Sequence, residues 1–569
     1  MAFIKKIIGL IVLLALIAAA CLYVLYRSWN PSPVDEALYY NGVLLTMDSD
    51  LPEASAMLVR QDRIISVGTL DHLNSQTSAS AQRIDLKGKT ILPGIVDAHG
   101  HFPGSGLSAI GVDANSPPIG DKNAIADVLA ALKVLAEKTP KGKWIRAFGF
   151  DDTMIADKRF ITRAELDSVS SQHPIFVMHI SGHMSVLNSM GLALVGYDES
   201  TPEPEGGEIV RDATGKLTGL VKESPHFLLL DKALTFSPQD ALKMTRHAVE
   251  EYLSQGVTSV QAGKLDLKQL QDLAIASQFG VVPQRMVAWP DVAAKRTMLS
   301  DEISFEYRDK FKVTATKFIS DGSIQGYTGY LAEPYFVIPE SESADYRGYS
   351  VFGEGDAELI VELIETHKQQ VAIHANGDAA IDSVLDILEP LTEVIQQHDL
   401  RPIIVHAQMA RPDQIERMQR IGVTPTYFVS HVRVWGDRHK NVFMGAQRAQ
   451  KIDPLRSSEL SGIKFSVHMD TPVLPMQSMQ MVEDAVVRKT YEGQVLGEQE
   501  RISVNSALQA ITINGAWQSH QEQDLGSLTA GKFADFIVLS DNPLTVDPEQ
   551  ISAIEVEQTY IGGALHFQK

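Results

Sequence analysis

The sequence of 569 residues contains a single cysteine, Cys21. This residue lies within an apolar segment near the N-terminus, so the rest of the chain has no thiol that could form a disulfide, bind a metal or act as a nucleophile. Any metal site in the remainder must therefore be built from histidine, carboxylate or modified lysine side chains.

Positive charge is also scarce, since 50 Lys and Arg residues stand against 71 Asp and Glu residues, giving a formal net charge of -21. Binding a phosphate backbone requires clustered basic residues, so this balance excludes nucleic acid as a partner. No internal repeat or low-complexity segment is present, which excludes a solenoid. No G-x-S-x-G motif follows an apolar run, which disfavours a serine hydrolase.

The segment from Ile7 to Tyr26 has no charged residue and is almost wholly apolar, about the length that a helix needs to cross a bilayer. Lys5 and Lys6 precede it, so the sequence predicts an inner-membrane anchor with the catalytic domain in the periplasm or another extracytoplasmic space. A cleaved signal peptide is the alternative. Lipidation at Cys21, after three alanines, is a minority option.

With 44% hydrophobic residues, the chain can bury a large core and holds more than one structural unit. Short strands are expected at 42–47 and 64–67 near the start, and at 534–539 and 559–563 near the end. The two ends are therefore expected to pair into one small β-sandwich.

Between the two ends, apolar strand-like runs alternate with amphipathic helical stretches, a pattern typical of parallel βα units that close into a barrel. One helix is expected to begin after Ser237 and to end before Gly256, followed by a strand over 257–260. The Pro- and Gly-rich region of about 104–236 fits this rhythm poorly and is interpreted as an insertion. The predicted units are an anchor and linker over 1–33, a first β-sandwich part over 34–92, a TIM barrel over 93–518 and a second sandwich part over 519–569.

Histidine and aspartate side chains stand at the ends of several predicted strands. His99 and His101 are spaced i, i+2, which places both on one face of an extended segment. His374, His406 and Asp470 each follow or end a later apolar run, at the strand end where barrel enzymes keep their sites. Because donors at the ends of the first, fifth, sixth and eighth strands meet at one mouth, we expect them to share a metal site.

Lys317 lies on the inward face of another predicted strand, an unusual place for an ammonium group. Burial lowers the pKa of a lysine and frees its amine, which CO2 can convert into a carbamate that bridges two cations. The alternative is a lysine paired with a neighbouring carboxylate such as Asp321.

These residues carry a resemblance to a known family. The sequence resembles the metal-dependent amidohydrolase superfamily, specifically its YtcJ-like amidohydrolase 3 branch, a group that includes N-substituted formamide deformylase. The matching motifs are Pro93-Gly94-Ile95-Val96-Asp97-Ala98-His99-Gly100-His101, Lys317-Phe318-Ile319-Ser320-Asp321-Gly322-Ser323, His374-Ala375-Asn376-Gly377-Asp378, His406-Ala407-Gln408, Asp470-Thr471-Pro472 and Gly526-Ser527-Leu528-Thr529-Ala530-Gly531-Lys532-Phe533-Ala534-Asp535.

The resemblance implies a (β/α)8 barrel with a split β-sandwich that holds one or two divalent cations, with zinc expected. It implies the ligands His99, His101, Lys317 as a carboxylated lysine, His374, His406 and Asp470. It also implies a lid segment over 181–189, in which His183 is a candidate for substrate contact or, equally, a structural histidine.

Two departures from the family pattern concern the substrate pocket. The segment from Gln325 to Thr328, which includes Tyr327, replaces a common Ser-Arg-Thr, and Val405 replaces a common Glu before His406. Tyr327 and Asp321 are accordingly predicted, with His183, to contact substrate.

The function expected from these residues is hydrolysis of a carbon–nitrogen bond in a small, non-peptide amide, by attack of a metal-activated hydroxide on the carbonyl carbon. Asp470 is expected to move the nucleophile's proton to the leaving group. His183 or His431 is expected to stabilise the oxyanion. The alternative is a non-catalytic relative that serves as a membrane-anchored binding or regulatory protein. No pattern in the sequence predicts an oligomeric state.

Overall fold

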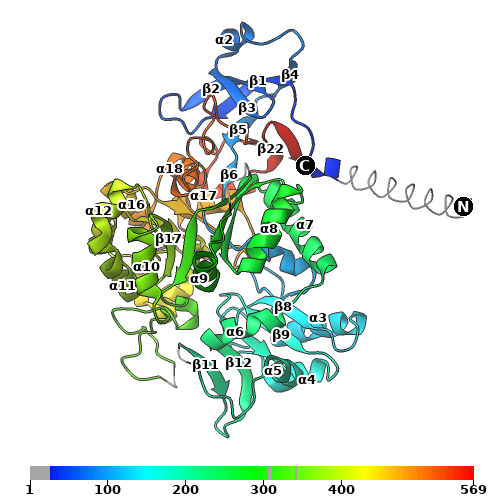
Figure 1. The fold of residues 1–569 in the computed structure, drawn as a ribbon, viewed down its shortest axis with the longest axis vertical. Coiled ribbons are helices and arrows are strands. Elements are labelled where there is room, and N and C mark those ends of the chain that lie inside the picture. Colours follow the sequence, from blue (N-terminus) through cyan, green and yellow to red (C-terminus); the bar gives the residue numbers. More distant parts are fainter. Residues whose placement is uncertain (1–25, 28, 205, 306–309, 340–341) are drawn as a thin grey trace, which may run out of the picture.

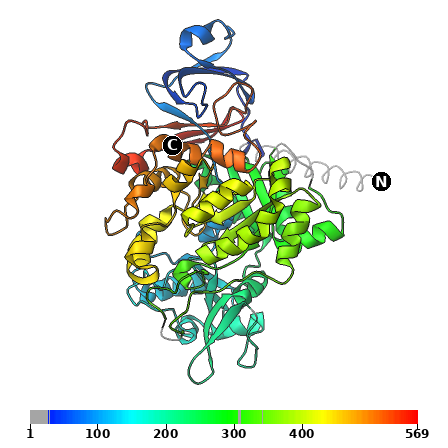
Figure 2. The same cartoon turned by 90° about the vertical axis from the view of Figure 1, so that its left-hand side faces the viewer.

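The computed structural model describes residues 26–569 except 28, 205, 306–309 and 340–341. Three regions follow one another along the long axis of the molecule (Figure 1): a sheet built from both chain ends, a barrel, and a second, smaller α/β region. Figure 2 shows the same three levels from the side.

The two ends of the chain share one mixed sheet of antiparallel and parallel strands. Strand β5 from the N-terminal part pairs antiparallel with β21 from the C-terminal part, with Ile91 opposite Val538. Tyr39, Phe536 and Tyr560 pack edge-on and face-on in its core. The elements of this region are β1 (Glu36–Leu45), β2 (Glu53–Arg60), β3 (Arg63–Gly68), α2 (Leu70–Asn74), β4 (Gln82–Asp85), β5 (Thr90–Pro93), β21 (Phe536–Leu539), β22 (Val556–Ile561) and β23 (Ala564–Gln568).

Eight parallel strands form the barrel within the described residues, in the order β6, β13, β14, β15 with β16, β17, β18, β19 and β20. Strands β15 and β16 are consecutive pieces of one strand that pair with β14 and β17 respectively. This order is that of the expected barrel. The bounds are β6 (Ile95–Val96), β13 (Val257–Leu265), β14 (Arg285–Pro290), β15 (Phe311–Val313), β16 (Ala315–Ile319), β17 (Gln370–Ala375), β18 (Ile403–His406), β19 (Thr424–Tyr427) and β20 (Ser466–Val467).

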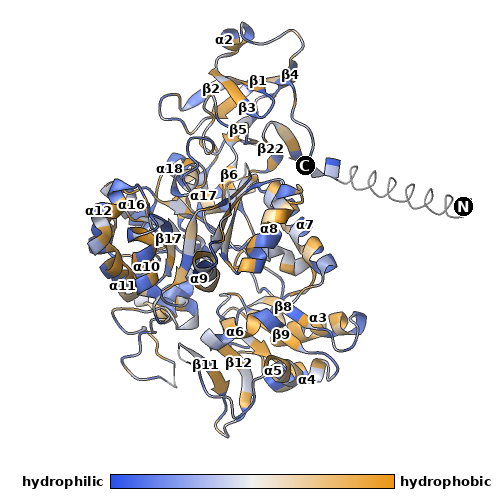
Figure 3. Ribbon diagram, viewed as in Figure 1, coloured by the Kyte–Doolittle hydropathy of each residue, from blue (hydrophilic) through white to orange (hydrophobic). Residues whose placement is uncertain are grey.

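Amphipathic helices cover the outside of the barrel, and Figure 3 shows that helices such as α7 and α8 carry both hydrophobic and hydrophilic residues. The barrel helices are α7 (Pro238–Ser254), α8 (Leu267–Gln278), α9 (Val292–Ser300), α10 (Asp356–Glu365), α11 (Asp378–Leu388), α12 (Thr392–Gln397), α13 (Pro412–Ile421), α14 (Ser430–Arg438), α15 (Gly445–Ala449), α16 (Leu455–Ser461), α17 (Ser478–Val487), α18 (Val504–Ala510) and α19 (Ile513–Gln518). Helix α7 begins as predicted, because the Ser237 hydroxyl accepts a hydrogen bond from the Asp240 amide.

The residues between β6 and β13 form a six-stranded sheet of their own, in the order β11-β12-β10-β9-β8-β7. It lies at the end of the barrel opposite the first sheet (Figure 1). Its elements are β7 (Val112–Asp113), α3 (Ile125–Lys138), β8 (Ile145–Phe150), α4 (Arg163–Val169), β9 (Ile175–His179), β10 (Met184–Leu187), α5 (Ser189–Val195), β11 (Gly207–Arg211), β12 (Leu217–Glu223) and α6 (Ser224–Ala233).

The N-terminal membrane helix is the part of the predicted fold that is corrected. Residues 1–25, which hold nearly all of the predicted segment, lie outside the described residues. In the part of the chain that is described, no helix is both long and apolar enough to cross a membrane; the longest, α7, has 17 residues and a polar face. A span needs about 20 predominantly apolar residues. No membrane span is therefore assigned, and the inner-membrane and periplasmic localisation that depended on it is withdrawn.

A buried ion pair joins the barrel to the sheet that is built from both chain ends. Arg285 on β14 donates to both carboxylate oxygens of Asp535, over 2.8 and 3.2 Å, and both side chains are at most 5% exposed. Asp535 also accepts from the Gly562 amide at 2.7 Å. Removing one partner of such a pair leaves the other charge buried, which costs about 3–5 kcal/mol.

We therefore expect Asp535→Ala to lower the free energy of unfolding by about 3–5 kcal/mol. Denaturant unfolding, followed by circular dichroism, measures this change. Asp541→Ala removes an exposed carboxylate from the next turn and is the matched control, with an expected change under about 0.5 kcal/mol. Equal unfolding midpoints for the two variants would show that the ion pair does not stabilise the junction.

Candidate metal centre

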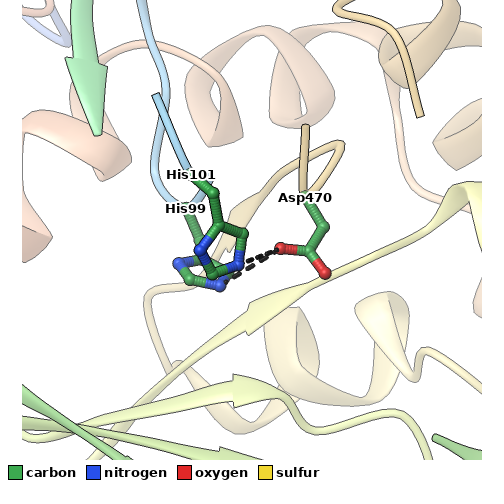
Figure 4. A group of neighbouring side chains, drawn as sticks. All are labelled: His99, His101 and Asp470. Atoms are coloured by element: carbon green, nitrogen blue, oxygen red, sulfur yellow. Dashed lines mark ion pairs between the residues drawn. The ribbon is translucent and has the colours of Figure 1, made fainter. Parts of the chain in front are cut away.

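Three ligand atoms converge at the mouth of the barrel. Asp470 Oδ1 lies 3.3 Å from His99 Nε2 and 3.2 Å from His101 Nε2. The two imidazoles approach the same carboxylate oxygen from the end of β6, and the carboxylate comes from the end of β20 (Figure 4). The three atoms all lie within 4.8 Å of one another.

The far nitrogens of both histidines are held by β13. His99 Nδ1 lies 3.2 Å from Gln261 Oε1, and His101 Nδ1 lies 3.2 Å from the Gly263 carbonyl oxygen. An acceptor at Nδ1 fixes the proton there and leaves Nε2 as the free donor atom for a metal. Burial, followed by the charge of Lys317, lowers the pKa of His99 to about 3, so its ring is neutral, as a ligand must be.

Asp470 lies three residues after β20 and has a left-handed backbone conformation, with φ of 53°. Aspartate is one of the few non-glycine residues that adopt this conformation readily. Its Oδ1 atom is buried and accepts no hydrogen bond within the described residues. Burial alone raises the pKa of Asp470, but His101 and His99 hold it well below its ordinary value, so the carboxylate is ionised.

Lys317 lies on β16 with its side chain inside the barrel, 3% exposed, and its Nζ is 3.3 Å from His99 Nε2. The ring of Trp289 stacks on His99 at 5.4 Å and lies 5.9 Å from the lysine Nζ. Burial lowers the pKa of Lys317 to about 7, although the charge of Asp470 opposes this. A substantial fraction of this lysine is thus a neutral amine near pH 7.

His374 and His406 stand at the ends of β17 and β18, with ring centroids 4.5 Å apart. His406 Nε2 is 3.9 Å from Asp470 Oδ2, and its Nδ1 is 3.1 Å from His468 Nε2. His374 Nε2 is directed to Asn376 Nδ2, 3.0 Å away. The six residues expected to hold metal therefore surround one region, although His374 and His406 lie outside the closest group of three.

The donor set fits a divalent cation. Imidazole nitrogens with a carboxylate are the ligands that zinc, iron and similar ions take in proteins. The buried Oδ1 of Asp470 has two imidazole nitrogens beside it and accepts no hydrogen bond from the residues that the structure describes. A cation between the three atoms would satisfy this environment.

A cavity of about 30 Å³ lies directly over these residues. His374, His406 and Asp470 line it from the barrel, and His183 lines it from the segment before β10. His431, at the start of α14, lines it from a further side. The inserted region therefore covers the mouth of the barrel, as segments of this kind often do.

The two additional histidines each have a buried acidic neighbour. His183 Nδ1 lies 2.8 Å from Glu223 Oε2, and the Glu223 side chain is fully buried. His431 Nδ1 lies 3.6 Å from Asp453 Oδ1, which is too long for a hydrogen bond. His183 thus has a fixed ring orientation, whereas His431 is held mainly by packing against Phe428 and Trp435.

A second, larger cavity of about 640 Å³ adjoins the first. Gln325 lines both, and Tyr327 lines the larger one. Asp321, the other predicted contact, lines neither. Its carboxylate accepts hydrogen bonds from the amides of Tyr330, Asn376 and Gly377 at 2.8–2.9 Å, so it organises the loops after β16 and β17.

A second group of possible ligands, Asp151, Asp152 and His179, lies in the inserted region. Asp151 is already bonded: one oxygen accepts from the Thr153 amide at 2.8 Å, and the other accepts from Trp435 Nε1 at 3.0 Å. This group connects the inserted region to α14 and needs no cation to satisfy it.

Sequence reasoning assigned no role to Gln261, Glu223 or His468, which fix the orientation of His99, His183 and His406. His468 gave a signal, because it stands directly after β20 and two residues before Asp470. Glu223 gave no such signal, since its partner, His183, lies 40 residues away along the chain.

Comparison with known proteins agrees with this geometry. The model of the amidohydrolase family matches residues 82–567. The chain is 27% identical over 545 residues to the N-substituted formamide deformylase of Arthrobacter pascens, covering 94% of this chain and 98% of that protein. It is 26% identical over 556 residues to the putative amidohydrolase YtcJ of Bacillus subtilis (strain 168), covering 94% of this chain and all of that protein.

A solved structure shares the fold. The crystal structure of an uncharacterized metal-dependent hydrolase from Pyrococcus horikoshii OT3 superposes with a TM-score of 0.73 at 24% identity, covering 90% of this chain and 99% of that one. The family model confirms the resemblance seen in the sequence motifs over residues 82–567. The chain belongs to the amidohydrolase family and is a metal-dependent hydrolase of carbon–nitrogen bonds.

Proposed function

We propose that this hydrolase cleaves N-substituted amides whose acyl group is as small as formyl. The observation that carries the proposal is the size of the cavity beside Asp470, about 30 Å³. A water molecule needs roughly 10–15 Å³ of such space, so the cavity admits a formyl group and little more. The rest of the substrate then extends past Gln325 into the larger cavity. The relative from Arthrobacter pascens is named for the same substrate class.

The proposed ligands are His99, His101, His374, His406 and Asp470, with Lys317 as a carbamate. The neutral amine of Lys317 would add to CO2, forming a nitrogen–carbon bond and releasing one proton, to give an anionic oxygen ligand beside His99. We propose zinc as the ion, since neutral imidazole and carboxylate suit it. A divalent cation at this place supplies Lewis acidity, polarising a carbonyl oxygen and acidifying a water molecule.

The protein's own side chains would divide the proton transfers and charge stabilisation. Asp470 is ionised and lines the inner cavity, so its carboxylate can take a proton from the attacking water and pass it to the departing amine nitrogen. His183 donates from Nδ1 to Glu223, and its ring centroid lies 5.3 Å from that of His374. That position suits stabilisation of the carbonyl oxygen as charge develops. His431 also lines this cavity and is the second candidate for this role.

Glu223 is expected to act as a positioning residue through His183. We expect Glu223→Gln to lower kcat about tenfold with little change in KM, because the glutamine keeps a hydrogen bond to Nδ1 but removes the negative charge that favours a protonated ring in the transition state. The pH profile of kcat provides the second readout: a purely structural role would leave its shape unchanged. Asp231→Asn, an exposed change on α6 that lines neither cavity, provides the control for loss of a carboxylate in the same region.

The proposed substrate class is tested by an activity screen of zinc-loaded protein against N-alkyl formamides, acetamides and benzamides, each with and without chelator. We expect the formamides to be cleaved about tenfold or more faster than the acetamides, because one added methyl group in a filled pocket costs roughly 1–3 kcal/mol. Equal rates on all three would contradict the proposal. Elemental analysis of the purified protein tests the binding-protein alternative, since a fully folded protein without stoichiometric metal would favour it.

A further inference from the structure

The larger cavity has a composition that selects for substrate charge. It lies between the inserted region and the loop after β16, and at about 640 Å³ it falls within the range of roughly 300–1,000 Å³ that small-molecule sites occupy. On the proposed function, everything in the substrate beyond the small acyl group occupies this space. The residues lining it therefore decide which amine portions are accepted.

Carboxylates outnumber cations among the described residues of its wall. Asp152, Glu203, Glu208 and Glu342 line it, against Lys222 as the one described lysine or arginine. The Lys222 Nζ atom forms a salt bridge with Glu208 Oε2 at 2.8 Å. Glu203 pairs at 3.1 Å with an arginine outside the wall, Arg211, and within the described residues Glu342 forms no salt bridge. Asp152 lies 3.2 Å from Nε2 of His179, which is also outside the wall. Glu342, which is exposed, is therefore the wall carboxylate whose negative charge stays unmatched among the described residues.

Aromatic rings share this wall. Phe160, Tyr327, Tyr346 and Tyr349 line the cavity. Burial first, and then the charges of Glu342 and Glu208, raise the pKa of Tyr346, which places the hydroxyl of this residue in the negative field of the carboxylates. Aromatic faces attract cations, and the combination with carboxylates is typical of sites that bind ammonium groups.

Gln325 gives evidence, independent of the charged and aromatic wall, that the larger cavity binds a ligand. This side chain lies where the two cavities meet and is 9% exposed. Its Oε1 atom is buried without a hydrogen-bond partner among the described residues. A buried amide oxygen left unpaired is costly, so this atom is placed to accept a donor from a bound molecule. The N–H group of a scissile amide, with its carbonyl in the inner cavity, would supply that donor.

From these observations we propose that the larger cavity binds the positively charged end of an amine-bearing substrate, so that the preferred substrates are N-formyl or similarly small N-acyl derivatives of diamines. Gln325 orients the amide N–H, and the carboxylates and aromatic rings hold the distal ammonium group. This inference rests on the proposed function, from which it takes the position of the amide.

Three formamides with the same pentamethylene spacer test the preference: N-(aminopentyl)formamide, N-hexylformamide and formamidohexanoate, which end in an ammonium, a methyl and a carboxylate group. We expect kcat/KM for the ammonium compound to exceed that for the methyl compound about tenfold, since partly exposed ion pairs each contribute roughly twofold to fivefold. The carboxylate compound should be the poorest. Raising the salt concentration should reduce the preference.

The double variant Glu208→Gln/Glu342→Gln should bring the ammonium and methyl compounds to nearly equal kcat/KM. Glu416→Gln, an exposed change on α13 away from both cavities, is the matched control and should keep the wild-type preference. Hydrolysis of all three formamides at equal kcat/KM would overturn the inference and leave the proposed function standing.

A binding measurement separates the two proposals if no formamide is hydrolysed. That outcome would count against the proposed function, and the charge selection is then judged by calorimetric titration with pentyltrimethylammonium at low ionic strength. Binding by the wild type that weakens about tenfold in the double variant supports a cation site. Absence of binding to the wild type overturns it.

Discussion

Asp470→Asn is expected to lower kcat by about 10²–10⁴-fold, the range that a positioned acid or base contributes. The substitution keeps the shape of the side chain and one oxygen at the centre of the contacts to His99 and His101. It removes the negative charge and the ability to carry a proton. Because both proposed roles of Asp470 require the carboxylate, the loss should appear in kcat rather than in KM.

Two further measurements show which role is lost. If metal content, measured by elemental analysis, stays near the wild-type value while kcat falls, then proton transfer is the function removed. If metal content falls as well, excess zinc should restore part of the turnover. Asp71→Asn on α2, exposed and far from the barrel, is the matched control. Turnover within threefold of wild type would remove Asp470 from the mechanism.

Removal of the metal is expected to abolish turnover and to lower the melting temperature. A ligand present at 1,000 times its dissociation constant stabilises the folded state by about 4 kcal/mol, and this contribution disappears when a chelator takes the ion. The site joins the ends of β6 and β20, so the loss should destabilise the barrel itself. Calorimetric melting and an activity assay, before and after dialysis against chelator, measure both effects.

His99→Ala separates this effect from any direct action of the chelator. The variant lacks one ligand of the closest group, so its melting temperature should already be low and should change little on chelator treatment. His398→Ala removes an exposed histidine at the end of α12 and should respond to chelator like the wild type. An equal fall in the melting temperature of His99→Ala would indicate that the metal binds elsewhere.

Local sequence determined much of this protein. A serine at the N-cap and a proline in the first turn gave the start of α7, and short apolar runs that alternate with amphipathic stretches gave the barrel strands. The positions of His99, His101, His406 and Asp470 could be related in advance for a general reason. Parallel strands place their carboxyl ends at one rim, so residues hundreds of positions apart meet whenever each ends a strand.

The tertiary structure decided what strand periodicity cannot encode. Gln261 reaches His99 across 162 residues, and Glu223 reaches His183 from a different strand of the inserted sheet. Asp321, predicted to contact substrate, is instead used by three backbone amides, which only the folding of the loops after β16 and β17 brings to it.

The tertiary structure was also needed to judge the predicted N-terminal membrane helix and the substrate cavities. Apolar composition suggested a membrane helix at the N-terminus, but apolar length alone does not fix where a segment lies, and no span is found in the described part of the chain. The two cavities arise where the inserted region meets the barrel, so their sizes and charges depend on packing between elements. Sequence thus determined the chemistry at the strand ends, because that follows from local geometry, while the tertiary contacts decided the shape and charge of the space around it.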